Sequence, residues 1–465
     1  MSLHSAARAV TTAPTGPPLS PEERAAVDAV IECARPDGGW TYVCNPPTGP
    51  HGVVTHILIR ARQLAEPFGG AGWDVLVLRS PGTPAAGMVL LEAWRRGGDG
   101  RDLAVARRAG DLFVDAQLPS GGWASEMPVV GPRLAGWFRW LNQWTALDDD
   151  VTSGAARFLL ELGVATGDVK YGDAARRALD LLLAAQLPDG AFPLTWRPAL
   201  LRRVSPSFED LASTNDAATA GPIRALLAGS ATLGDSRYAA AARRGGDWLL
   251  AAQGPPPLAA WAQQYDREGR PGPGRRFEPS GYAAWESREM LDALLAIAQA
   301  TGDARYCRAV PAAVAWFLRS RIAPGCWARL YDPADGSPLF AAADGRRVAS
   351  ADEAKRPYKW TGDYGIPGLL AELGLAADGS PLPPSGPPPP QRLFGDAGAC
   401  PGTVAIEDAP DDENPRARIV RAAVLLGRSS RPARSPCSAS LAIANAPAGD
   451  ASARPVAVES TGDSR

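Results

Sequence analysis

Acidic side chains gather at two positions that are equivalent within the chain. Three consecutive aspartates, Asp148 to Asp150, precede an apolar stretch with helical spacing, and Asp216 follows Ser213-Thr214-Asn215 before the next such stretch. One aspartate is enough to cap a helix, because a carboxylate accepts helix N–H groups and complements the helix dipole. Three adjacent carboxylates repel one another unless a cation or separate partners hold them. Helix capping and an oxygen-ligand site for Ca2+ are therefore the two interpretations.

A second set of candidate residues lies between positions 261 and 287, where polar and aromatic side chains are dense. The segment contains WAQQYD at 261–266, GRRFEP at 274–279 and WES at 285–287. Tryptophan faces stack on sugar rings, and an arginine fork holds a carboxylate through two parallel hydrogen bonds. The alternative is a loop whose aromatic residues anchor it to the core while its charges face water.

The scarcest residues exclude several kinds of site. The chain has three histidines, His4, His51 and His56. A Ser-His-Asp triad, a Cys-His pair or a multi-histidine zinc site would therefore have to be built from the N-terminal edge. The six cysteines contain no CxxC pair, so we expect buried small side chains or free thiols in a reducing compartment.

Charge and hydropathy narrow the possible partners. Lys and Arg number 48 against 50 Asp and Glu, a net charge of -2, so nucleic acid is not an expected partner. No uninterrupted run of apolar residues is long enough to span a membrane. The first residues lack the apolar stretch of a secretory signal, so a cytoplasmic protein is expected from the sequence as written. We also expect a monomer.

The elements that must position these residues form an internal repeat. Gln117, Gln186 and Gln253 end similar segments at spacings of 69 and 67 residues. Regular self-similarity of this kind indicates one supersecondary unit that is stacked several times. Gly-Asp turns recur with the same period and place aspartates at Asp99, Asp168, Asp235 and Asp303.

Each repeat unit is predicted to be a pair of helices. Ala155, Phe158, Leu159 and Leu162 have the spacing of one apolar helix face, and the second helix of that unit ends at a Pro-Asp-Gly turn. Five or six such pairs predict an all-α fold that closes into an α/α toroid, with the polar loops at one mouth. The predicted domain covers 21–375, between a disordered segment 1–20 and a disordered Pro/Ala-rich tail 376–465.

The polar motifs, taken in order, resemble a known family. From about Ser80 to Leu373 the chain is similar to the pectate lyases of polysaccharide lyase family 10 and looks like a divergent member. The motifs that carry the resemblance are ALDDDVT at 146–152, QLPDGAFP at 186–193, STND at 213–216, WAQQYD at 261–266, GRRFEP at 274–279, AAWES at 283–287 and WARLYD at 327–332.

The resemblance implies an α/α toroid and β-elimination on polygalacturonate or a related uronate polymer. It implies Ca2+ bound by Asp148, Asp149 and Asp216, which would make the proton at C5 of the uronate more acidic. Arg275 matches the arginine implicated as proton acceptor, although arginine is normally protonated at every working pH. Similar lyases are usually secreted. The residues expected to bind the acidic polysaccharide are Trp261, Gln264, Asp266, Glu286, Arg329, Lys355, Arg356 and Tyr358.

The sequence also departs from the family pattern. Where related chains carry an arginine in GDRDG, this chain has AAADG at 341–345, and Asp150 replaces a glycine of the first acidic motif. The late basic element is changed as well, so Lys355 and Arg356 would have to replace a carboxylate clamp with different geometry.

Three other functions remain open at this point. Gln117, Gly121 and Trp123 fit the QxxxGxW signature of terpene cyclases, but the catalytic acidic motifs of those enzymes are missing. An α/α-barrel glycoside hydrolase acting on unsaturated uronides would use Asp148 and Asp216 as acid and base without a metal. A protein of the same fold could also bind acidic glycan without cleaving it. Metal dependence and an unsaturated product distinguish the lyase from all three.

Overall fold

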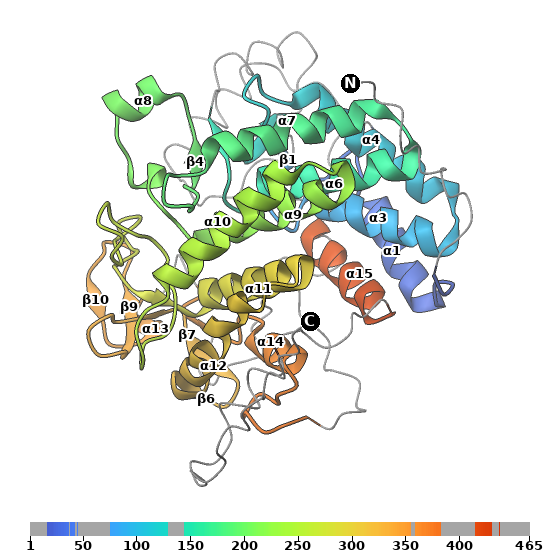
Figure 1. Cartoon of the computed structure of the whole chain (residues 1–465). Coiled ribbons are helices and arrows are strands. Elements are labelled where there is room, and N and C mark those ends of the chain that lie inside the picture. The colour runs from blue at the N-terminus through green and yellow to red at the C-terminus, as the bar shows by residue number, and fades with distance from the viewer. Residues whose placement is uncertain are drawn as a thin grey trace, which may run out of the picture.

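The computed structural model describes residues 16–36, 38–41, 44, 75–128, 144–354, 359–382, 414–429 and 437. These residues form a ring of paired helices, so the predicted all-α toroid is confirmed (Figure 1). Within the described ranges, no helix combines the length and the apolar character that a membrane crossing requires. The main helices are α1 (Pro21–Glu32), α3 (Thr83–Gly97), α4 (Gly100–Ala116), α6 (Val151–Thr166), α7 (Val169–Ala185), α9 (Ala220–Leu233), α10 (Ser236–Ala252), α11 (Ala284–Thr301), α12 (Val310–Arg319), α14 (Ile366–Glu372) and α15 (Pro415–Ser429).

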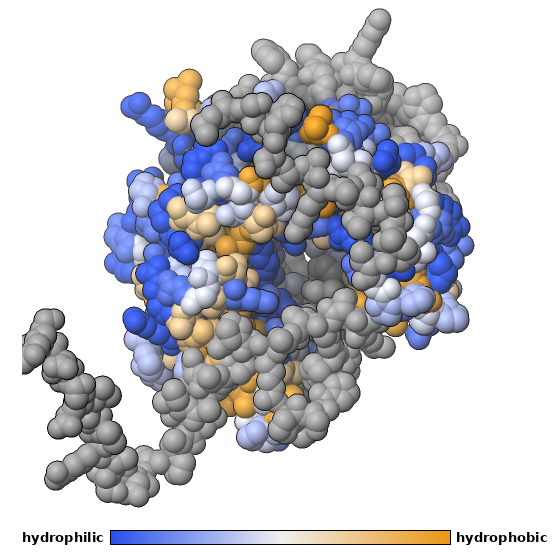
Figure 2. All heavy atoms as spheres, turned by 45° about the vertical axis from the view of Figure 1, so that its right-hand side comes forward, coloured by the Kyte–Doolittle hydropathy of each residue, from blue (hydrophilic) through white to orange (hydrophobic). Residues whose placement is uncertain are grey.

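The inner layer of the ring consists of α3, α6, α9 and α11, each packed on the next. Their outer partners are α4, α7, α10 and the 3-10 turn η3 (Ala304–Ala309) that leads into α12. The burial patterns explain the two layers, because most side chains of α6 are buried whereas α4 and α7 keep an exposed polar stripe. Figure 2 shows a hollow in the middle of the face it presents, with hydrophilic side chains among those at its edge.

The repeated Gly-Asp turns join each inner helix to its outer partner. The glycine ends the inner helix in a left-handed conformation, with φ of 69° at Gly167 and Gly234, which only glycine adopts without cost. The following aspartate is the N-cap of the outer element, and its side chain accepts the N–H two residues later. The recurring Gly-Asp turns are thereby confirmed, and the structure shows that Asp99, Asp168, Asp235 and Asp303 are N-caps.

The repeated glutamines connect one helix pair to the next. The Nε2 group of Gln117 donates to the carbonyl of Ala174 at 2.8 Å. In the next two repeats, Gln186 donates in the same way to the carbonyl of Ala241, and Gln253 to that of Ala309. Each bond spans adjacent outer elements and satisfies a backbone carbonyl there. The glutamine of the QxxxGxW pattern is therefore accounted for by packing between repeats.

Short antiparallel strands cover the end of the ring where the inner helices begin. The strand β3 (Thr145–Ala146) pairs with β4 (Thr195–Trp196) and leads towards α6, while β5 (Tyr282–Ala283) leads directly into α11. β5 is the edge strand of the sheet β10-β9-β8-β5, in which β8 is Leu330–Tyr331, β9 Pro338–Ala341 and β10 Arg347–Val348. The remaining strands are β1 (Val75–Val77), β2 (Glu126–Pro128), β6 (Arg321–Ala323), β7 (Cys326–Ala328) and β11 (Thr361–Gly362), and the other short helices are α8 (Ala199–Val204), α13 (Ala351–Ala354), η1 (Phe208–Asp210) and η2 (Asn215–Ala217).

Two expectations from the sequence are wrong. The cysteines within the described ranges are not free thiols, because Cys33 pairs with Cys44, Cys307 pairs with Cys437, and Cys326 is disulfide-bonded as well. The tail is not without structure throughout, because α15 lies within it. This helix packs on α1 and α3, so the C-terminal helix lies beside the N-terminal one (Figure 1). Its apolar side chains Ile419, Ala422 and Leu426 recur at helical spacing and are buried there.

Candidate functional site

The two acidic segments meet at the start of the inner helices. The backbone N–H of Asp149 donates to the carbonyl of Asp216 at 2.6 Å, which confirms that the segments share one mouth of the ring. Three of the acidic residues have left-handed backbones, with φ of 53° at Asp149, 55° at Asp150 and 48° at Asp216. Such backbones are uncommon without glycine and cluster at functional sites, because the surrounding structure must hold them.

Helix capping does not explain these acids. Asp150 is the N-cap of α6 but makes no cap hydrogen bond through its side chain, which instead forms an ion pair with Arg157. The N-cap of α9 is Thr219, which lies three residues after Asp216. Oδ1 of Asp148 is buried without a hydrogen-bond partner, an expensive arrangement unless a further ligand is bound.

The electrostatics of the cluster favour a positive charge. Burial raises the pKa of Asp148 well above its usual range, and the neighbouring carboxylates Asp149 and Asp216 raise it further. Burial and Asp216 raise the pKa of Asp149 to about 6, against the lowering effect of nearby arginines. Proximity of like charges in a poorly solvated place has this effect on Asp148 and Asp149.

The cluster offers the type of ligand that a hard cation such as Ca2+ prefers, namely carboxylate oxygens. One of these oxygens, Oδ1 of Asp148, has no hydrogen-bond partner. Among the residues that the structure describes, however, no group of three or more His, Cys, Asp or Glu side chains is arranged to hold a metal ion by itself. A cation at this cluster would therefore need additional oxygen ligands.

Arg275 joins the acidic cluster from the loop before α11. Its Nη2 lies 3.5 Å from Oδ2 of Asp216, and its Nε lies 2.8 Å from Oε1 of Glu278. Arg276 points elsewhere, because its Nε donates to the carbonyl of Asp344 at 3.0 Å and its side chain is exposed. The geometry thus distinguishes the two adjacent arginines of the GRRFEP motif.

A buried network of hydrogen-bonded polar side chains holds Arg275 in position. Gln263 donates to Oε1 of Glu278 at 3.1 Å and to Oδ1 of Asn215 at 2.6 Å, and Asn215 donates to Oδ2 of Asp216 at 2.6 Å. The network fixes the relative position of Arg275 and Asp216. The sequence motifs contain Gln263, Asn215 and Glu278, but the sequence predicted no role for them. The available signal was the spacing of Glu278, an acidic residue three positions after Arg275.

Arg329 and Glu286 complete the charged mouth. Nη2 of Arg329 lies 2.7 Å from Oε1 of Glu286 and 4.0 Å from Oδ1 of Asp216. Its guanidinium also lies over the ring of Trp285, 5.4 Å from the centroid. Glu286 is fully buried in the first turn of α11, so it orients Arg329 and has no surface through which to contact a polymer. The structure therefore replaces its predicted substrate contact with a positioning role.

Glu286 provides a prediction about pH. Burial raises its pKa from 4.5 to about 7, while Arg329 lowers it and Asp216 and Glu289 raise it. The folded protein then holds a proton between about pH 4.5 and about pH 7 that the unfolded chain releases. This group should therefore lower the free energy of unfolding, by roughly 3 kcal/mol, as pH rises through that interval.

Urea denaturation of the parent and of Glu286→Gln across this pH interval measures the effect. Glutamine cannot titrate, so the difference in unfolding free energy between the two proteins should change with pH in the stated direction. The comparison between the two proteins cancels the pH dependence that other acids with raised pKa values contribute, such as Glu372. Equal pH dependence in both proteins would show that Glu286 does not titrate in this range.

Three predicted substrate-binding residues have structural roles instead. Trp261 is fully buried, and its indole N–H donates to the carbonyl of Leu249 at 2.8 Å, so it cannot stack on a sugar. The amide of the buried Gln264 donates to the carbonyls of Phe208 and Ala212. The carboxylate of Asp266 closes a turn by accepting the N–H groups of Glu268 and Arg270. Lys355, Arg356 and Tyr358, also predicted to bind substrate, lie outside the described residues.

The structure is an α/α toroid that gathers arginines and carboxylates at one mouth. Residues 140–325 match the family model described as pectic acid lyase. This part of the chain is similar to the family, so the resemblance seen in its motifs is confirmed. A comparison with curated proteins finds no match.

Solved structures of similar proteins include carbohydrate-active enzymes. A family 10 polysaccharide lyase from Cellvibrio cellulosa is 22% identical with a TM-score of 0.48, over 61% of this chain and 93% of its own. A variant of that lyase, in complex with a galacturonic acid trimer, matches with the same identity and TM-score over 61% and 94%. The unsaturated glucuronyl hydrolase from Bacillus is 16% identical with a TM-score of 0.36, over 51% of this chain and 59% of its own.

Proposed function

We propose that the protein cleaves polygalacturonate or a related uronate polysaccharide by Ca2+-assisted β-elimination. The observation that carries this proposal is the convergence of Arg275 and Arg329 on Asp216, beside Asp148 and Asp149. Guanidinium groups bind a sugar carboxylate, and carboxylates bind a cation that the same sugar carboxylate can share. A neutral polysaccharide lacks the carboxylate that a guanidinium fork and a cation could share.

The reaction needs charge stabilisation more than it needs a nucleophile. The C–H bond at C5 breaks, its electrons form the C4–C5 double bond, and the C4–O bond breaks as the leaving oxygen takes its electron pair. A general base takes the proton from C5 and a proton is delivered to the leaving oxygen, so the step is balanced and consumes no water or oxidant. Negative charge accumulates on the uronate carboxylate while C5 is deprotonated, and fixed cations stabilise that charge.

Arg275 is proposed as the residue that holds this charge. Arginine is protonated at working pH, and Arg275 is already ion-paired with Glu278 and Asp216. Its role is therefore to clamp the carboxylate and stabilise the enolate, in place of the proton-accepting role that the family resemblance implies. Arg329 would take a second position on the same carboxylate, held by Glu286.

Ca2+ is proposed to be held by Asp148, Asp149 and Asp216 together with oxygens of the substrate, because these three side chains do not complete a site. When bound, it would supply Lewis-acid polarisation of the uronate carboxylate. Ligand linkage predicts about 2.7 kcal/mol of added stability at a hundredfold excess of ligand over its Kd. The effect should be larger with a galacturonate oligomer present and absent in Asp216→Asn.

The test mixes the protein with polygalacturonate and Ca2+ and follows the ultraviolet absorbance of the unsaturated product, then adds EDTA. Continuous growth of absorbance that stops with EDTA supports the proposal. Thermal denaturation with Ca2+ or chelator provides the binding readout. Binding of the polymer without any unsaturated product would favour an acidic-glycan-binding protein, and a metal-independent release of saturated or hydrated sugar would favour a glycoside hydrolase.

A further inference from the structure

Asp149 is approached by two arginines that come from outside the segment matched by the family. Nε of Arg79 lies 3.5 Å from Oδ2 of Asp149. Arg416, at the beginning of α15, donates through Nη2 to the carbonyl of Ser80 at 2.8 Å. Ser80 in turn donates its N–H to the carbonyl of Asp149 at 2.9 Å. The C-terminal helix therefore brings a cation to the loop that carries Arg79.

The charges of both arginines reach the acidic cluster. Arg79 and Arg416 each lower the pKa of Asp149, against burial and Asp216, which raise it. At the other end of the cluster, Arg275 and Arg329 face Asp216. The acidic cluster thus has one pair of arginines near Asp149 and another pair near Asp216.

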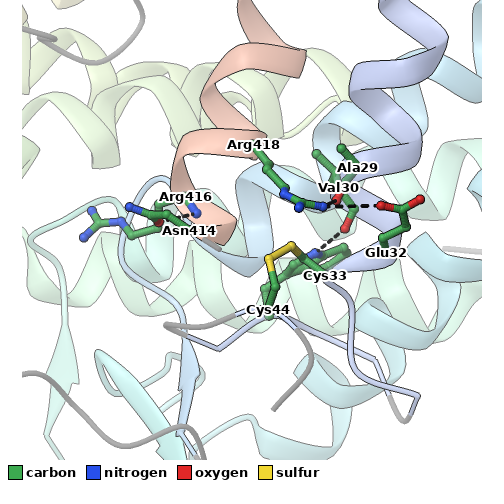
Figure 3. Close-up of a disulfide and its surroundings, with 9 residues drawn as sticks. Ala29, Val30, Glu32, Cys33, Cys44, Asn414, Arg416 and Arg418 are labelled. Carbon is green, nitrogen blue, oxygen red and sulfur yellow. Dashed lines mark hydrogen bonds and ion pairs between the residues drawn. A yellow bond between two sulfur atoms is a disulfide. The ribbon is translucent and has the colours of Figure 1, made fainter. Parts of the chain in front are cut away.

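The helix that carries Arg416 is firmly held. It packs on α1 and α3, and Arg418 donates to the carbonyl of Ala29 at 3.1 Å and lies 3.4 Å from Glu32. The disulfide between Cys307 and Cys437 ties the chain beyond α15 to η3. Figure 3 shows that Arg416 and Arg418 leave the helix in different directions, Arg418 towards α1 and Arg416 away from it.

We propose that Arg79 and Arg416 form a second carboxylate-binding site, which holds the sugar next to the one held by Arg275 and Arg329. This inference rests on the proposed function, because a uronate polymer carries a carboxylate on every sugar. Arginine forks bind carboxylates through paired hydrogen bonds, whereas lysine provides only a point charge. The substrate class is accordingly a polymer whose neighbouring sugars both carry free carboxylates.

The variant Arg416→Gln tests the second site. Its KM for polygalacturonate should rise about tenfold, while kcat stays within about twofold of the parent value, because the residue binds a sugar other than the reacting one. Arg416→Lys should recover part of the loss. On a highly methyl-esterified polymer that the parent still cleaves, the ratio of KM between variant and parent should shrink, since few carboxylates remain to be bound.

Arg418→Gln is the matched control. It removes an arginine that anchors the same helix but lies away from Asp149, so KM should stay near the parent value even if the melting temperature falls. The proposal is overturned if Arg416→Gln leaves KM unchanged, or if Arg418→Gln raises KM equally. A parent protein that neither binds nor cleaves uronate polymers would instead overturn the proposed function, and the second site with it.

Discussion

Replacing Arg275 by lysine is expected to lower kcat on a cleavable uronate polymer by about 10²–10³-fold, the usual cost of removing one fixed group that stabilises transition-state charge. Lysine keeps the positive charge but cannot contact Asp216, Glu278 and a substrate carboxylate at once through a planar fork. KM and the melting temperature should change much less than kcat, because most contacts with the polymer and the core stay in place.

Arg276→Lys is the control for this experiment. Its side chain is exposed and contacts the carbonyl of Asp344, away from the acidic cluster, so kcat should remain near the parent value. Steady-state kinetics on the two variants, with circular dichroism to verify folding, decide between the adjacent arginines. Parent-like kcat in Arg275→Lys would remove Arg275 from the catalytic site.

Removing the disulfide between Cys307 and Cys437 is expected to cost about 5 kcal/mol of unfolding free energy. In the chain-entropy account, a link across a sequence separation of 130 residues strongly restricts the unfolded chain. The double substitution Cys307→Ala and Cys437→Ala avoids leaving one reactive thiol. KM should stay near the parent value in the folded variant, as in Arg418→Gln, because α15 still packs on α1 and α3.

The disulfide between Cys33 and Cys44 provides the comparison, since it joins residues only 11 apart and the same account gives about 3 kcal/mol. Urea denaturation of the two double-alanine variants measures both losses. If the Cys307/Cys437 variant unfolds at the same urea concentration as the parent, the long-range disulfide does not stabilise the fold. Unchanged KM in a folded variant would show that α15 keeps its place without the link.

The repeat architecture could be predicted from sequence because its signals are local. Helical spacing of apolar residues, a left-handed glycine after each inner helix and an aspartate cap after it all act within a few residues of chain. The same locality placed Asp148 and Asp216 at the starts of successive inner helices, and hence at one mouth. The motif resemblance added Arg275 and Arg329 to that mouth.

The use of each polar side chain could not be predicted in this way. Trp261 and Gln264 have the residue types of a sugar site, yet they face the core and satisfy backbone carbonyls there. A residue type states which bonds a side chain can make, whereas its direction depends on the neighbouring repeat. For the same reason, the sequence did not predict the hydrogen-bond network around Arg275, and it predicted that Glu286 contacts the substrate.

The sequence by itself determined the helix pairs, their repeat and the acidic and basic motifs, because propensity, spacing and capping are properties of short segments. Only the tertiary structure decided that α15 packs beside α1, that Cys307 meets Cys437 and that Arg416 reaches Ser80. Arg416 and Ser80 are 336 residues apart in sequence. The physical reason is that such contacts join segments far apart in sequence, so they depend on closure of the ring. The helical spacing of apolar residues in α15 indicates a helix, but it does not indicate which helices that face packs on.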